Sequence, residues 1–275
     1  MIKNITKFIN EIKRVGQRDD FENFFRGHSK LSYSMTPTIY RQGLIKNEDK
    51  IFRESILRIP QEFSGLKSAI EILVKMQHYG VPTRLLDITS NPLVALFFAC
   101  KSNPDIDGEV IFLQVPKPEI RFYDSDTVSV VANIAKRPFP FEIENYDGIK
   151  IKDFNSLSSV QYLHHDIKEE KPYFKEIIKP GHMEQVYVVK VKLDNLRILK
   201  QGGAFLLFGI HATKERQAEV PEQWKLNGKN HLNLIIPAGK KEKILTELDV
   251  LGINESTIFP ELEYQAKYLI EKFKK

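Results

Sequence analysis

The segment from residue 83 to residue 100 constrains the fold of this chain more tightly than any other. Its apolar Leu85-Leu86 pair leads into Asp87-Ile88-Thr89-Ser90, and Asn91-Pro92 then opens an apolar stretch that ends at Cys100. Asn is a good helix N-cap and Pro is favoured at the first helical position, so a helix is predicted to begin here. The segment therefore predicts a strand that passes directly into a helix, with polar side chains at the junction.

The rest of the chain alternates between helical and strand patterns, without an internal repeat. Helical spacing of apolar residues predicts helices, and short apolar runs bounded by Gly or Pro predict strands. The predicted helices cover residues 4–14, 47–59, 68–78, 92–100, 240–251 and 264–273, and the predicted strands cover 20–28, 109–115, 185–191, 203–210 and 232–236. This order predicts an α+β fold with a mixed or antiparallel sheet flanked by helices.

The length and composition fit one domain of this kind. Of the 275 residues, 42% are hydrophobic and 28% are charged, which is ordinary for a globular chain and too apolar for disorder. We expect a single domain over residues 1–275, with core motifs in 20–115 and 183–270. An elaborated middle region, residues 120–180, matches no motif.

Cysteine use and hydropathy exclude several classes of protein. A single cysteine, Cys100, excludes a disulfide framework and any all-cysteine metal site. The longest apolar run, residues 92–100, is far shorter than the roughly 20 residues that span a bilayer, and the first residues lack a signal-peptide core. We therefore expect a cytoplasmic protein with no metal and no membrane association.

The net charge of +5 is concentrated in the first sixty residues, and the rest of the chain is balanced. Such an excess is compatible with a nucleic-acid-binding face, although no block of consecutive basic residues is present. The same stretch contains Phe25-Arg26-Gly27, which places a guanidinium beside a residue without a side chain. A phosphate could approach the backbone there while Arg26 binds it, or Arg26 could instead pair with a carboxylate such as Asp87.

Three further groups of polar residues are candidates for ligand binding. At a helix exit, His78, Tyr79 and Arg84 lie within eight residues, and Gly80 and Pro82 explain the turn without them. A hydrogen-bonded structural corner is the alternative. The next group comprises Asp87, Thr89 and Ser90, which precede a predicted helix N-terminus, where an anion is favoured; N-capping is the alternative. The last group is Gln201 with Gly202 and Gly203, for which a turn before a hairpin suffices.

Together these motifs resemble a known family, the FRG domain. The resemblance covers roughly residues 20–270. It rests on Phe25-Arg26-Gly27, Gln77-His78-Tyr79-Gly80, Pro82-Thr83-Arg84-Leu85-Leu86-Asp87, Thr89, Asn91-Pro92, Gln201-Gly202-Gly203-Ala204-Phe205 and Ile258-Phe259-Pro260-Glu261-Leu262-Glu263. It implies an effector or toxin of bacterial or phage conflict systems, with a role in phage defence among the expectations.

The order of the motifs also resembles that of ADP-ribosyltransferases, which implies NAD as substrate and a split-sheet core. By this resemblance Arg26, with Gly27 beside it, holds NAD, and Thr89-Ser90 shapes the nicotinamide pocket. Gln201 stands where a catalytic Glu is expected. Because an amide supplies no negative charge to a cationic transition state, Asp87 or Glu184 would have to provide it.

Three hypotheses about function follow. The first is an NAD-dependent ADP-ribosyltransferase or NAD-cleaving enzyme in which Arg26, Asp87 and Gln201 are catalytic and Tyr79 stacks on a ring of the ligand. The second is a non-catalytic module that binds a nucleotide or nucleic acid, with a protein or nucleic-acid target. The third is an interaction domain in which Arg26 and Asp87 form a buried structural pair.

Overall fold

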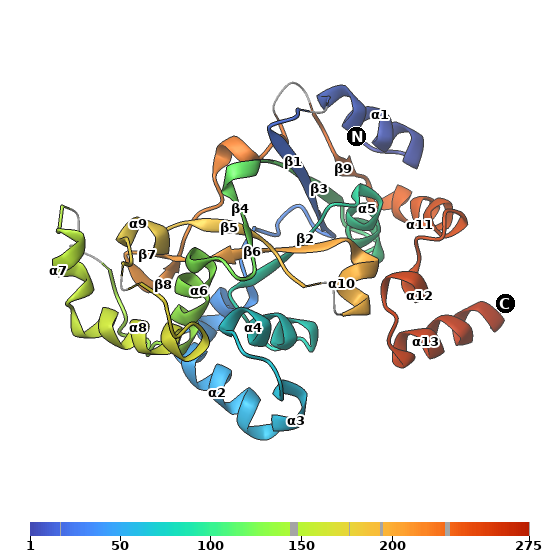
Figure 1. Cartoon of the computed structure of the whole chain (residues 1–275). Helices are drawn as coiled ribbons and strands as arrows, with labels where there is room; N and C mark the ends of the chain where they lie inside the picture. Colours follow the sequence, from blue (N-terminus) through green and yellow to red (C-terminus); the bar gives the residue numbers. More distant parts are fainter. Residues whose placement is uncertain (17, 144–147, 176, 193–194, 229–231, 275) are drawn as a thin grey trace.

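The computed structural model describes residues 1–16, 18–143, 148–175, 177–192, 195–228 and 232–274. In this part of the chain a seven-stranded sheet forms the centre, with helices packed around it (Figure 1). Its strands are β1 (Phe21–His28), β2 (Leu85–Thr89), β3 (Gly108–Pro116), β4 (Ile120–Phe122), β5 (Val186–Lys190), β6 (Gly203–Phe208) and β9 (Ile235–Ile236), and a small second sheet pairs β7 (Ile210–His211) with β8 (Thr213–Gln217). The predicted α+β class is confirmed.

The six predicted helices are all present, and the structure adds several short helices and the 13-residue α8. They are α1 (Ile5–Val15), α2 (Glu48–Arg58), α3 (Pro60–Phe63), α4 (Ala69–His78), α5 (Pro92–Lys101), α6 (Asp126–Asn133), α7 (Ile151–Asn155), α8 (Ser158–Glu170), α9 (Pro180–Met183), α10 (Leu196–Gln201), α11 (Lys241–Val250), α12 (Glu255–Ile258) and α13 (Leu262–Phe273), with a 3₁₀ segment η1 (Thr38–Asn47). The α5 start is capped as predicted, since the Asn91 side chain accepts a hydrogen bond from the Leu93 amide at 3.0 Å.

The strand order is β4-β5-β6-β2-β1-β3-β9, and all neighbours are antiparallel except β4 and β5. β1 pairs with β3 along its whole length, and β2 does the same with β6. In contrast, β1 and β2 share a single register pair, Phe25 opposite Thr89. The sheet therefore consists of two halves, β4-β5-β6-β2 and β1-β3-β9, joined at one point in its middle.

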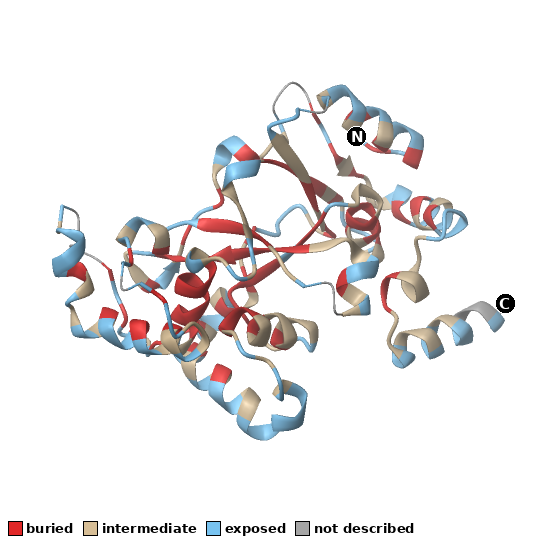
Figure 2. Ribbon diagram, viewed as in Figure 1, coloured by how far each residue is buried: buried red, intermediate tan, exposed pale blue. Residues whose placement is uncertain are grey.

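Each half of the sheet buries one face against its own group of helices. Leu85 and Phe205 pack in a cluster with α4, α6 and α8, while Phe25 and Phe112 pack in another with α1, α5 and α11. The opposite face is covered by irregular segments that include the buried Trp224. Figure 2 shows that buried residues concentrate in the central strands and in the helix faces turned toward them. The division of the sheet is therefore also a division of the core on the helix-covered face, whereas one cluster spans both halves on the opposite face.

The structure corrects two predictions of secondary structure and shows what the middle region contains. The strand predicted for residues 232–236 is reduced to Ile235–Ile236. Gln201 ends helix α10 rather than starting a hairpin turn, because Gly202 adopts the left-handed conformation (φ 55°) of a helix C-cap. The middle region, 120–180, contributes β4 and helices α6–α8 to the fold. Its residues 144–147 and 176 lie outside the described part.

None of the helices in the described ranges combines the length and the apolar character that crossing a membrane requires.

Candidate functional site

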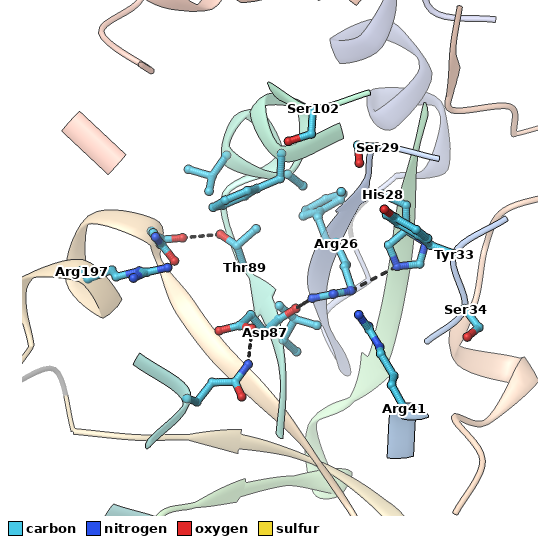
Figure 3. Close-up of a pocket in the computed structure, with 18 residues that line it drawn as sticks. Arg26, His28, Ser29, Tyr33, Ser34, Arg41, Asp87, Thr89, Ser102 and Arg197 are labelled. Atoms are coloured by element: carbon cyan, nitrogen blue, oxygen red, sulfur yellow. Dashed lines mark hydrogen bonds between the residues drawn. The ribbon is translucent and has the colours of Figure 1, made fainter. Parts of the chain in front are cut away.

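A cavity of about 400 Å³ lies where the two halves of the sheet meet (Figure 3). Its walls come from β1, β2, α4, α5, α10 and the segments that follow β1 and α5. The lining residues that carry polar side chains are Arg26, His28, Ser29, Tyr33, Ser34, Arg41, Gln77, Asp87, Thr89, Ser102, Arg197 and Gln201. Residues from distant parts of the chain therefore share one cavity, and four motifs from the sequence contribute to it.

The tripeptide Phe25-Arg26-Gly27 performs three different tasks on one strand. Phe25 is buried and its ring lies 4.5 Å from that of Phe112 on the neighbouring strand. Because side chains alternate along a strand, Arg26 points to the opposite face from Phe25 and Gly27. A Cβ on Gly27 would lie 2.0 Å from the Ala95 carbonyl oxygen, so the space beside Gly27 is occupied by α5. Helix α5, rather than the expected phosphate, therefore lies against the backbone at Gly27.

Gly27→Ala is expected to destabilise the fold by about 3 kcal/mol, because a methyl group cannot fit against the α5 backbone without moving the helix. Chemical denaturation of the purified variant measures this. Gly239→Ala is the matched control, since no atom lies within 4 Å of the position that its methyl group would take. Equal unfolding free energies for the two variants would contradict the packing explanation.

Arg26 is held at two points and retains unpaired donors. Its Nε donates to Nε2 of His28 at 3.2 Å, and its Nη1 donates to the Asp87 backbone oxygen at 2.6 Å. A guanidinium has five N–H groups, so three are left over. Within the described residues no carboxylate lies at salt-bridge distance from Arg26, and the proposed buried pair with the Asp87 side chain is absent. Arg26 is thus a positioned cation that forms no ion pair within the described part of the chain.

The electrostatic surroundings of Arg26 agree with this geometry. Burial lowers the pKa of the Arg26 guanidinium from its usual value, the Asp87 carboxylate opposes this shift, and the nearby Arg41 adds to it. An arginine remains protonated even so. An anionic ligand would therefore offset both the cost of burying the Arg26 charge and the repulsion between Arg26 and Arg41.

Asp87 is exposed, and its carboxylate is held by a short chain of hydrogen bonds. The Gln77 side-chain amide donates to Asp87 Oδ2 at 2.7 Å, and the Thr83 hydroxyl donates to Gln77 Oε1 at 2.7 Å. The Leu85 amide in turn donates to the Thr83 hydroxyl at 3.1 Å. Thr83 thus orients the Gln77 amide so that its NH₂ group faces Asp87. Gln77, one of the polar residues at the helix exit, therefore positions the Asp87 carboxylate.

Thr89 and Gln201 line the cavity, whereas Ser90 does not. The Thr89 hydroxyl donates to the Gln201 backbone oxygen, and the Ser90 hydroxyl donates to the Gly202 backbone oxygen at 3.3 Å. These two hydroxyls therefore fasten the end of β2 to the link between α10 and β6. The Gln201 side-chain amide donates to the Ile258 carbonyl at 3.4 Å, so the C-terminal motif also contacts the site.

His78 and Tyr79 lie beside the cavity and do not line it. Tyr79 is 60% exposed, and its hydroxyl donates to Glu62 at 3.2 Å. His78 lines a smaller neighbouring hollow, where its Nε2 lies 3.5 Å from Glu261. Burial lowers the pKa of the His78 imidazole, and the nearby Arg197 guanidinium lowers it further. The proposed stacking of Tyr79 on a ligand ring does not fit this placement.

The prediction that Arg84 binds the ligand is wrong. Arg84 is fully buried, and its Nε and Nη2 donate to the two carboxylate oxygens of Glu48 at 2.9 and 2.5 Å. Its Nη1 donates to the Phe208 backbone oxygen. A second buried cation, Lys214, lies 3.1 Å from Glu48 Oε2. The Arg84 guanidinium is thus engaged in a buried structural ion cluster and is not free to bind a ligand.

Among the cavity residues that sequence reasoning missed are His28, Arg41 and Arg197. His28 could have been found, because it follows Arg26 by two positions on a strand and so shares its face. No local signal marks Arg41 in its loop or Arg197 in the short helix α10. The Arg197 Nη1 donates to the His78 carbonyl at 3.3 Å, and its guanidinium lies over the Phe259 ring at 4.8 Å. The alternative carboxylate, Glu184, is exposed and does not line the cavity.

Within the described residues, no cluster of three or more His, Cys, Asp or Glu side chains is arranged to hold a metal ion. Comparison with curated proteins finds no match, and no solved structure matches the chain either. The profile of one protein family does match, over residues 22–107, a range that includes β2, α5 and all of β1 but its first residue. This range contains the Phe25-Arg26-Gly27 tripeptide and the Asp87 support, and these residues accordingly match the FRG domain.

Proposed function

We propose that the protein binds NAD in this cavity and cleaves the bond between nicotinamide and ribose, as an ADP-ribosyltransferase or an NAD-cleaving enzyme. The observation that carries the proposal is Arg26, a half-buried cation with three unpaired N–H groups and no carboxylate partner among the described residues. A guanidinium in this state favours a phosphate oxygen, because charge-assisted hydrogen bonds are strongest where water is scarce.

The distribution of charge in the cavity suits such a ligand. Arg26, Arg41 and Arg197 supply three positive groups, and Asp87 supplies one negative group. The volume of about 400 Å³ lies in the range of small-molecule sites and suits the nicotinamide riboside half with its phosphate. Phe98, on α5, adds an aromatic wall. A ring of the ligand can stack there, in place of the expected stacking on Tyr79.

The arrangement also offers a route for the reaction. As the bond between ribose C1′ and the nicotinamide nitrogen breaks, its electron pair leaves with the neutral nicotinamide and positive charge develops on the ribose. The Asp87 carboxylate, positioned by Gln77, stabilises that charge and takes the role that Gln201 cannot fill. A nucleophile from water or from a target side chain then bonds to C1′ and releases a proton.

Arg26→Gln is expected to raise the Kd for NAD roughly 10- to 100-fold, because hydrogen bonds to a charged group contribute about 1.5–3 kcal/mol. Isothermal titration calorimetry with NAD measures this. Arg216→Gln is the matched control, since Arg216 is exposed on β8 and does not line the cavity. Equal losses of affinity in both variants would show that only the overall charge matters.

Release of nicotinamide from labelled NAD, with and without a mixture of candidate target proteins, tests the catalytic part of the proposal. Label transferred to protein supports ADP-ribosyl transfer, and free ADP-ribose supports NAD cleavage. Binding of NAD without either product would instead support a non-catalytic nucleotide-binding module. A steep loss of RNA or DNA affinity with salt, without NAD binding, would support a nucleic-acid module.

The proposal extends to a toxin or phage-defence role, since loss of NAD or modification of a target arrests growth. Expression of the wild-type chain in bacteria, with and without phage challenge, is compared with expression of Arg26→Gln. Growth arrest or phage resistance that depends on Arg26 supports this role, and identical growth curves overturn it.

A further inference from the structure

The starting point for a further inference is His28, a buried histidine in the wall of the cavity. It is 2% exposed and lies at the end of β1, two positions after Arg26 and therefore on the same face of the strand. Its Nε2 lies 3.2 Å from Nε of Arg26. In Figure 3 a dashed line marks this contact between the two side chains in the cavity wall.

The chemistry of this contact determines which nitrogen of His28 carries the proton. The Nε of an arginine always bears hydrogen and can only donate, so Nε2 of His28 must accept with a lone pair. The proton of the neutral imidazole is therefore on Nδ1. Within the described residues Nδ1 has no hydrogen-bond partner, and the Glu109 carboxylate lies 3.5 Å from it.

The sheet itself brings Glu109 to this position. His28 and Glu109 are register partners on the antiparallel strands β1 and β3, so their side chains lie side by side on one face. Glu109 is partly exposed, whereas the imidazole is buried. A negative charge beside Nδ1 favours the tautomer with hydrogen on that nitrogen, and this tautomer is the one that Arg26 requires.

We propose that Glu109 and His28 form a relay that positions Arg26 for an anionic ligand. Glu109 sets the tautomer of His28, and His28, a positioning residue, then holds Arg26 by accepting its hydrogen bond. Two contacts, one to His28 and one to the Asp87 backbone oxygen, hold the plane of the guanidinium and leave its outer N–H groups toward the cavity. A flexible arginine loses conformational entropy when it binds, and a pre-positioned one loses less. The inference rests on the proposed function for the identity of the ligand.

The first test reads the tautomer directly and needs no ligand. ¹⁵N NMR of the imidazole in the wild-type protein is expected to show His28 protonated at Nδ1, and the Arg26 Nε–H is expected to exchange slowly with water. In Glu109→Gln the Nδ1-protonated fraction is expected to fall. An Nε2-protonated His28 in the wild type, or a rapidly exchanging Arg26 Nε–H, would overturn the relay.

The second test measures affinity for ADP as the probe. His28→Phe keeps a buried planar ring and removes the acceptor, and we expect the Kd for ADP to rise roughly tenfold. His28→Gln is expected to recover part of this loss, because its amide oxygen can accept from Arg26. His211→Phe is the control, since His211 is exposed on β7 and does not line the cavity.

The two tests separate the relay from the proposed function. If the wild-type protein does not bind ADP or NAD, the proposed function fails, while the tautomer and the exchange rate still decide whether the relay exists. If ADP binds and His28→Phe binds it as tightly as the wild type with an unchanged unfolding midpoint, His28 does not position Arg26 and the inference is wrong.

Discussion

Replacement of Asp87 by Asn is expected to lower the rate of nicotinamide release about 100- to 1,000-fold while changing the Kd for NAD less than threefold. The amide keeps the shape of the side chain and can still accept the hydrogen bond from Gln77, so the site remains assembled. What it loses is the negative charge that opposes the positive charge developing on the ribose. Removal of one group that stabilises developing charge typically costs a factor of this size.

Steady-state and single-turnover assays on labelled NAD distinguish an effect on the rate of nicotinamide release from an effect on NAD binding. Asp105→Asn serves as the matched control, because Asp105 is exposed in the loop after α5 and does not line the cavity. A variant at Asp87 that turns over NAD at the wild-type rate would remove the catalytic assignment. A variant that loses NAD binding instead would make Asp87 a binding residue.

Glu48→Gln is expected to reduce the free energy of unfolding by about 3–5 kcal/mol, the usual cost of leaving buried charge without its partner. Glu48, Arg84 and Lys214 are all buried, and this one carboxylate contacts both cations. Burial alone would raise the pKa of Glu48, but the two cations outweigh it, so the pKa lies below its usual value. Burial also lowers the pKa of Lys214 to about 8, against the attraction of Glu48.

The sign of the pH dependence follows from the lowered pKa of Glu48. The stabilisation from its charge is complete above its usual pKa near 4.5 and is lost as the pH falls through the lower folded-state value. Urea denaturation should therefore show a large difference between wild type and Glu48→Gln at pH 7 and a smaller one toward pH 3. Glu215→Gln, at an exposed position on β8, is the control. A difference in unfolding free energy between wild type and Glu48→Gln that stays constant from pH 7 to pH 3 would contradict the role of the Glu48 charge.

Part of the candidate site could be predicted because its residues belong to short local patterns. Arg26, Asp87, Thr89 and Gln201 all belong to motifs that the sequence singles out, and the structure brings them to one cavity. Arg84 stands in the same motif as Asp87 and looks equally suited to an anion. Whether a guanidinium faces a cavity or the core depends on Glu48, which lies 36 positions away, and no local pattern contains that information.

The sequence by itself determined most of the secondary elements outside the middle region and the approximate places where they begin and end. The Asn91-Pro92 start of α5 and the alternation of β1 follow from capping chemistry and side-chain period, which act over a few residues. Only the tertiary structure decided that β1 and β2 would touch at a single residue pair, and that Arg41 and Arg197 would converge beside Arg26. These features depend on strand pairing and packing between distant segments, and the cavity exists because the sheet opens where those pairings end.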